Sequence, residues 1–197
     1  MICELWFSTP IWSGKFINIS DQDYNNAVNY CILLSTRSPG RIKSNVGGWQ
    51  SEELYYHNLI KTPLQIFIEQ IKPAVGEALY DLGITQELKL NNIWININSN
   101  NDENKIHHHA GSSISGVFYL TSNNSDIVFY RNRDISDVHL AWLKSNRNTM
   151  LSFPMAKYTP TRGQYLIFPS WLEHSVEPNK SIEKRISVSF NVAFVDD

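Results

Sequence analysis

The sequence predicts a mainly β protein, a β-sandwich or jelly roll with helices supporting one side. Two observations lead to this fold class. One amphipathic helical pattern stands in the first half of the chain, and from residue 87 onward apolar residues recur with a period of two. The period-two segments are short, rich in β-branched and aromatic residues, and separated by turn residues: 88–98, 113–120, 126–130, 163–169 and 185–194.

Residues 1–60 have a mixed pattern. A short apolar entry strand is followed by the polar segment DQDYNN, and then by a loop with turn signals at Pro39, Gly47 and Gly48. This region is therefore expected to contribute support and loops rather than core strands.

One helix is predicted over residues 63–82. Thr62 suits the N-cap, Pro63 suits the first helical position, and Gly83 suits the stop. Apolar residues recur at spacings of three and four, which gives the helix one buried face. Pro73 is expected to kink or split it.

The chain of 197 residues is long enough for one domain with a sizeable core. We expect residues 1–197 to form a single domain, with a mixed helical and strand support region at 1–86 and the jelly-roll strands at 87–197. Hydrophobic residues make up 42% of the chain, and the net charge is −2. This charge argues against nucleic acid and anionic membranes as partners.

Two cysteines, Cys3 and Cys31, have neither metal-ligand spacing nor a disulfide framework, which indicates a reducing, cytoplasmic compartment. The N-terminal segment lacks a basic stretch and a long apolar core. It therefore resembles neither a signal peptide nor a membrane span.

Three consecutive histidines, at 107, 108 and 109, are the first candidate site. On an extended strand, residues i and i+2 share a face, so His107 and His109 would point the same way and His108 the other way. With His174, which follows the aromatic strand YLIFP, they would form a facial set of three metal ligands that leaves opposite positions open. A solvated histidine run in a polar loop is the simpler alternative.

The second candidate is the segment RISVSFN. Period two places Arg185 and Ser187 on its polar face, together with Ser189 and Asn191. An arginine on a central barrel strand is costly unless it meets an anion. A guanidinium suits a carboxylate, and a hydroxyl two residues on can add a further bond. A structural salt bridge is the alternative reading.

Taken in order, these motifs resemble the 2-oxoglutarate- and Fe(II)-dependent oxygenases. The order is His-x-His, a strand ending in Tyr-Leu, Gly-x-x-x-x-Phe-Pro, His, then Arg-x-Ser. More narrowly, HHHAGSSISGVFYL, FPSWLEHSVEPN and SNVGGWQSEEL resemble a bacterial and phage family of such enzymes. The resemblance implies a double-stranded β-helix (jelly roll) with supporting helices.

The resemblance also implies an activity and its cofactors. Fe(II) and 2-oxoglutarate would be required, and molecular oxygen would be consumed with release of succinate and CO2 as a substrate is hydroxylated. His107 and His174 match iron ligands, and Arg185 and Ser187 match the pair that holds the far carboxylate of 2-oxoglutarate. Tyr119 matches a strand tyrosine that contacts the same carboxylate, and Asn98 is a further co-substrate candidate.

One position departs from the superfamily pattern, because most members have Asp or Glu where this chain has His109. Three alternatives follow. The iron takes His107, His109 and His174, which we favour; or a carboxylate comes from elsewhere, with Asp102, Glu103 and Asp126 nearby in sequence; or His108 is the ligand and Ala110 stands at the acidic position.

Two other classes of function remain open at this level. One is a three-histidine cupin-type dioxygenase that uses no 2-oxoglutarate, against which Arg185 and Ser187 argue. The other is a non-catalytic jelly-roll binding module. The substrate is unidentified, a small molecule or a peptide side chain, and a homodimer is compatible with the sequence.

Overall fold

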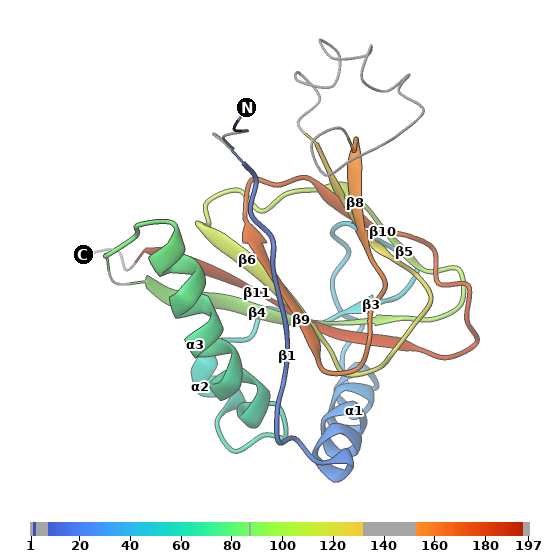
Figure 1. Ribbon diagram of the computed structural model, residues 1–197. Helices are drawn as coiled ribbons and strands as arrows, with labels where there is room; N and C mark the ends of the chain where they lie inside the picture. Colours follow the sequence, from blue (N-terminus) through green and yellow to red (C-terminus); the bar gives the residue numbers. More distant parts are fainter. Residues whose placement is uncertain (1, 3–7, 87, 132–152, 195–197) are drawn as a thin grey trace.

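The computed structural model describes residues 2, 8–86, 88–131 and 153–194. Two antiparallel sheets face each other, and three helices cover the outer face of the larger one (Figure 1). The six-stranded sheet has the order β1-β9-β6-β11-β4-β3, and the five-stranded sheet has the order β2-β5-β10-β7-β8. This is the jelly-roll architecture predicted from the sequence. Cys3 lies outside the described residues.

Four of the five period-two segments form strands of the larger sheet, and the segment 126–130 forms a strand of the smaller one. The strands of the larger sheet are β1 (Trp12–Lys15), β3 (Trp49–Gln50), β4 (Leu88–Asn98), β6 (Ile114–Tyr119), β9 (Gln164–Pro169) and β11 (Arg185–Phe194). In the smaller sheet the strands are short: β2 (Asn45–Val46), β5 (Glu103–His107), β7 (Ile127–Tyr130), β8 (Met155–Tyr158) and β10 (His174–Val176).

The helices are α1 (Asp21–Ser35), α2 (Tyr56–Leu59) and α3 (Gln65–Asp81). Helix α3 corresponds to the predicted helix, but it begins two residues later and its N-cap position is Leu64, without a side-chain cap. Pro73 lies inside it, so the helix is not split there. Helix α1 was not predicted; a capping box formed by Ser20 and Asp23 starts it.

Alternation along β11 separates two cores. Ile186, Val188 and Phe190 face the helices, in a core that includes Phe67 and Ile68 of α3. The other side of the same sheet faces the five-stranded sheet, where Tyr119, Phe129 and Phe168 belong to a second, smaller core. The polar residues of β11 therefore face the space between the sheets.

Gly116 in β6 is fixed by this packing. A Cβ atom there would lie 2.2 Å from the ring of Phe190, so only glycine lets the ring pack against the strand.

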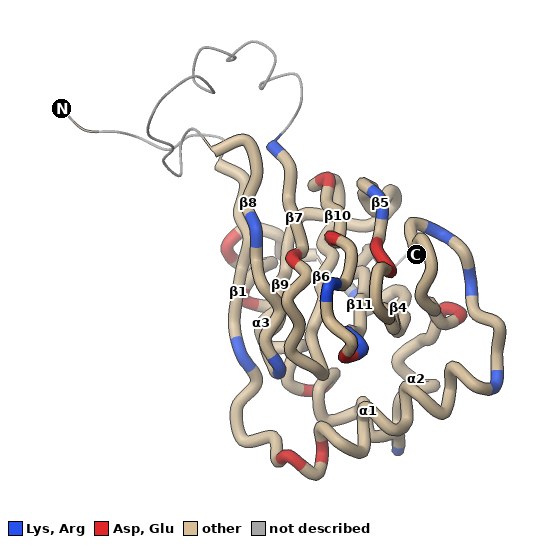
Figure 2. Tube along the Cα trace, turned by 90° about the vertical axis from the view of Figure 1, so that its right-hand side faces the viewer, with Lys and Arg blue, Asp and Glu red and all other residues tan. Residues whose placement is uncertain are grey.

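Acidic and basic positions are interspersed along the trace of the described chain (Figure 2). None of the described helices combines the length and apolar character needed to cross a membrane.

Candidate metal and co-substrate site

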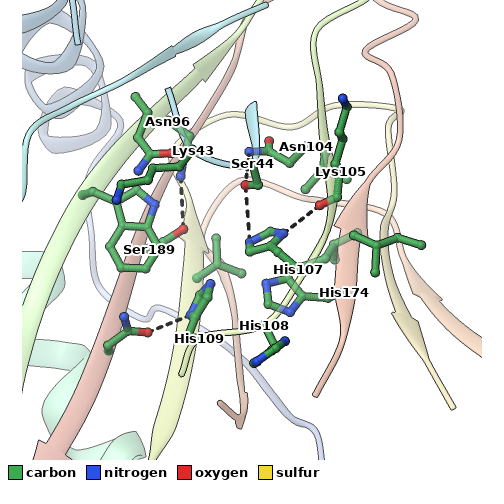
Figure 3. A pocket seen from close by; sticks show the side chains of 18 of the residues that line it. Lys43, Ser44, Asn96, Asn104, Lys105, His107, His108, His109, His174 and Ser189 are labelled. Carbon is green, nitrogen blue, oxygen red and sulfur yellow. Dashed lines mark hydrogen bonds between the residues drawn. The ribbon is translucent and has the colours of Figure 1, made fainter. Parts of the chain in front are cut away.

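Three imidazoles meet between the two sheets (Figure 3). One ring nitrogen from each of His107, His109 and His174 lies within 4.8 Å of the others. The ring centroids are 4.3 Å apart for His107 and His174, 5.2 Å for His107 and His109, and 5.0 Å for His109 and His174. Such spacing allows three nitrogens to share one transition-metal ion on one side.

Strand pairing places two of the three. His174, the first residue of β10, lies directly opposite His107, the last residue of β5. Because directly opposed residues point to the same face of a sheet, these imidazoles become neighbours. His109 lies two residues beyond the end of β5, so the shared-face argument does not apply to it. A backbone bond of 2.9 Å from the His109 N–H to the Ser170 carbonyl holds that turn.

Two of the imidazoles are oriented by backbone carbonyls. The Nδ1–H of His107 donates to the Lys105 carbonyl at 2.7 Å, and that of His174 donates to the Leu172 carbonyl at 2.8 Å. A proton held on Nδ1 leaves the lone pair on Nε2, which is the arrangement that a metal ligand needs. The Ser44 hydroxyl lies 3.5 Å from His107 Nε2.

His109 is oriented by a side-chain network instead. Its Nδ1 lies 2.7 Å from Asn191 Oδ1 and 2.8 Å from the Ser115 hydroxyl. Ser115 also donates to Asn191 Oδ1 at 2.7 Å and lies 2.8 Å from the Ser170 hydroxyl. All three partners are buried, so His109 is held as firmly as the other two ligands would be.

Burial keeps these imidazoles neutral. Burial is the main cause that lowers the pKa of all three imidazoles. The pKa of His109 falls to about 4 and that of His174 falls well below its usual range, and the neighbouring histidines lower both further. The cluster can therefore accept a cation at neutral pH without first losing protons.

The other ligand candidates, His108 and the nearby carboxylates, are not part of the three-imidazole cluster. His108 lines the cavity, but its ring is not part of the three-nitrogen cluster. The Asp102 carboxylate accepts from the Ser99 N–H at 2.6 Å, and Asp126 accepts from the Thr159 hydroxyl at 2.7 Å. Glu103 lies at the far end of β5. In the described part of the chain, no carboxylate joins the three imidazoles.

Next to the cluster lies a buried guanidinium. Arg185 is 2% exposed, and its Nε and Nη1 have no hydrogen-bond partner among the described residues. Its guanidinium carbon lies 5.9 Å from the centre of the Tyr119 ring, and burial lowers its pKa. A buried charge of this kind requires an opposite charge nearby, because its desolvation costs several kcal/mol.

Four other buried oxygens of the described residues also lack a hydrogen-bond partner, and three of them lie on the strands around Arg185; the fourth is Asn92 Oδ1. The three are the Tyr119 hydroxyl, the Ser187 hydroxyl and Asn98 Oδ1. Strand register brings them together, since Asn98 pairs with Arg185 and Tyr119 pairs with Ser187. Burial raises the pKa of Tyr119 to about 12, so its hydroxyl stays protonated and can donate. The guanidinium and the two hydroxyls are donors that fit one carboxylate, whereas Asn98 Oδ1 is an acceptor and cannot bond to it directly.

The histidines and Arg185 open on one cavity of about 740 Å3. That volume lies in the usual range of small-molecule sites. Tyr119 and Arg185 line its inner part, whereas Ser187 and Asn98 do not reach the lining. Trp94, Asn96 and Ser189 line it as well, and the indole of Trp94 lies edge-on to His109 at 5.3 Å.

Comparisons with known proteins agree with this arrangement. A family model described as "Putative 2OG-Fe(II) oxygenase" matches residues 92–191, which hold the three histidines, Tyr119, Arg185 and Ser187. No curated protein sequence matches the chain.

Solved structures of low sequence identity share the fold. A prolyl-4-hydroxylase from Pseudomonas putida is 10% identical, with a TM-score of 0.67 over 96% of this chain and 95% of its own. The non-heme alpha ketoglutarate dependent carbocyclase SnoK from nogalamycin biosynthesis is 13% identical (TM-score 0.65; 95% and 81% covered). HygX from Streptomyces hygroscopicus, solved with nickel and 2-oxoglutarate, is 9% identical (0.61; 95% and 83%).

Proposed function

The chain belongs to the family of 2-oxoglutarate- and Fe(II)-dependent oxygenases, and on this premise we propose that His107, His109 and His174 bind the Fe(II). We further propose that Arg185 and Ser187, with Tyr119, bind the distal carboxylate of 2-oxoglutarate, and that Asn98 is a further co-substrate residue beside them. One observation carries both assignments: a three-imidazole cluster and a buried guanidinium without an acid partner among the described residues open on one cavity.

Each residue has a distinct task in this proposal. The imidazoles present Nε2 to the metal because Nδ1 is engaged by Lys105, Leu172 and the Ser115–Asn191 pair. Arg185 can donate two hydrogen bonds to a carboxylate, to which the Tyr119 and Ser187 hydroxyls add one each. When bound, Fe(II) would activate O2; oxidation of 2-oxoglutarate to succinate and CO2 would take up one oxygen atom of O2, and hydroxylation of the substrate the other.

Three neutral histidines give the metal one negative charge fewer than two histidines and a carboxylate would. The only buried charge beside the cavity in the described residues is the positive one of Arg185. We propose that the dianionic co-substrate supplies the missing compensation. Binding of metal and of 2-oxoglutarate should therefore be strongly coupled.

We also propose a small molecule or a peptide side chain as substrate. The net charge of −2, with acidic and basic positions interspersed along the trace (Figure 2), supports this over nucleic acid. A cytoplasmic location is part of the proposal, supported by the buried free thiol of Cys31, whose pKa burial raises to about 12. A homodimer is compatible with this proposal. The motifs are phage-like in that they resemble those of the bacterial and phage family.

The decisive experiment is anaerobic calorimetry with Mn(II) in place of Fe(II). The parent protein should bind 2-oxoglutarate only when metal is present. Arg185→Lys keeps the charge but loses the forked geometry, so it should weaken 2-oxoglutarate by about tenfold or more, with metal affinity unchanged. Ser187→Ala should weaken it less, because one neutral hydroxyl is lost.

Other outcomes would assign the chain differently. A cupin-type dioxygenase would bind metal but not 2-oxoglutarate at millimolar concentration. A structural arginine would lower the melting temperature in Arg185→Lys without changing the affinity for 2-oxoglutarate. Either result would contradict the proposal.

A further inference from the structure

The outer part of the cavity carries two lysines that the co-substrate site does not use. Lys43 precedes β2 and Lys105 lies in β5, and both line the cavity. Figure 3 shows Lys43 on the side of Asn96 and Ser189, and Lys105 on the side of Ser44 and Asn104. Within the described residues, neither ammonium group forms an ion pair.

Acidic groups do not balance these lysines. Glu53 is the one acid among the described residues that line the cavity. Its carboxylate already accepts from Arg41 Nη1 at 2.8 Å, so its charge is compensated by a residue outside the lining. The ammonium groups of Lys43 and Lys105 thus act on the cavity without an opposing acid.

Loading the site with metal and co-substrate would leave this positive charge unchanged. Fe(II) and the dianion of 2-oxoglutarate cancel, and three imidazole ligands add no negative charge. The charge that remains around the cavity is therefore the sum of the positive charges of Arg185, Lys43 and Lys105. The whole chain has a net charge of −2, so the positive charge is local to this cavity. A concave site lined by one sign of charge attracts ligands of the other sign.

The wall beside Lys43 can hold the rest of such a ligand. Asn96 and Ser189, joined by a hydrogen bond of 3.1 Å, offer polar groups, and the Trp94 indole offers an apolar face next to His109. Resting on the function proposed above, we infer that the substrate is a small organic anion. Its acidic group binds next to Lys43, with Lys105 adding to the positive potential of the cavity, and its carbon skeleton lies along the Trp94 indole beside His109.

The test uses molecules that differ in charge alone. N-acetylated alanine, leucine and phenylalanine, each as the free acid and as the primary amide, are titrated by calorimetry into protein loaded with Mn(II) and 2-oxoglutarate. The free acids should bind about fivefold tighter than the amides, as expected for exposed ion pairs. The double change Lys43→Gln with Lys105→Gln should abolish this preference, while Lys15→Gln, which removes one lysine charge on β1 outside the cavity lining, should keep it.

The possible results separate two failures. Equal binding of acids and amides, no binding of either up to about 10 mM, or an acid preference that survives the double change would each overturn the inference. Binding of 2-oxoglutarate is measured first in every variant and should not change. If the parent protein binds no 2-oxoglutarate, the proposed function fails rather than the substrate class.

Discussion

Two buried polar clusters meet at Asn98 and differ in how their hydrogen-bonding groups are used. In one, the Asn179 amide makes four bonds: to the carbonyls of Asn98 and Glu183, and from Asn123 and the Ser181 N–H. In the other, Arg185, Tyr119 and Ser187 have buried polar atoms without a partner in the described chain. Polar groups that stabilise the fold are satisfied within the chain, whereas these atoms are available to a ligand.

The largest expected effect on the free energy of unfolding comes from replacing Asn179, whose amide makes the bonds of the satisfied cluster. Asn179 is fully buried, and Asn179→Ala removes four hydrogen bonds from its buried surroundings. At about 1 kcal/mol each, the free energy of unfolding should fall by about 4 kcal/mol. Denaturant unfolding measures this loss, and Asn124→Ala, at an exposed position in the same loop region, should stay within about 0.5 kcal/mol. A loss below about 1 kcal/mol would contradict the structural role.

The next effect concerns the network that holds His109. Asn191→Leu removes the acceptor for the Nδ1–H and should weaken the metal by about 10- to 100-fold. Calorimetry with Mn(II) measures the change. Ser189→Ala, two residues earlier on the same face of β11, is the control and should leave metal affinity unaltered. Equal affinities in the parent and Asn191→Leu would show that the turn after β5 alone positions His109.

The pH dependence of stability comes from the histidine cluster, because imidazoles titrate, whereas the amides of the Asn179 cluster do not. The folded pKa of His109 is lowered to about 4, while the unfolded chain takes up a proton near 6.5. The unfolded state thus binds more protons between these values, and stability falls as pH falls through that window. By pH 5 the metal-free protein should lose about 2 kcal/mol through His109 alone. His109→Asn should flatten this dependence.

The smallest expected effect concerns Arg185. Its replacement should not lower the free energy of unfolding, whereas the replacement of Asn179 should. Replacing a buried charge that has no acid partner with an apolar side chain is often neutral or stabilising. Arg185→Met should therefore leave the free energy of unfolding unchanged or raise it by about 1 kcal/mol, although it removes 2-oxoglutarate binding. Thermal unfolding without ligands tests this. A loss of more than about 1 kcal/mol would assign Arg185 to the structural cluster.

The sequence predicts the ligand-facing strands well for a physical reason. In β4 and β11, apolar residues pack on the helices at every second position, so Arg185, Ser187 and Asn98 are necessarily on the opposite face. The short strands β5 and β10 carry little such alternation, and their existence depends on tertiary pairing. Helix α1 was missed because few of its residues are buried apolar ones.

The partners of the histidines could not be predicted in the same way. Ser44 and Ser170 reach the site through turns, and Ser115 and Asn191 meet His109 from two different strands. None of these contacts produces a local pattern in the amino-acid sequence. The histidine motif indicated which imidazoles to consider, but only the fold shows how each ring is oriented.

The position of β11 has a consequence for how the molecule is made. This strand lies between β4 and β6, although it follows both by many residues in the chain. Until residues 185–194 have left the ribosome, β4 and β6 have no common neighbour, and neither the guanidinium nor Asn191 is present. Closing the sheet and completing the site are thus one event during synthesis. A chain that lacks this strand should therefore bind neither metal nor 2-oxoglutarate tightly.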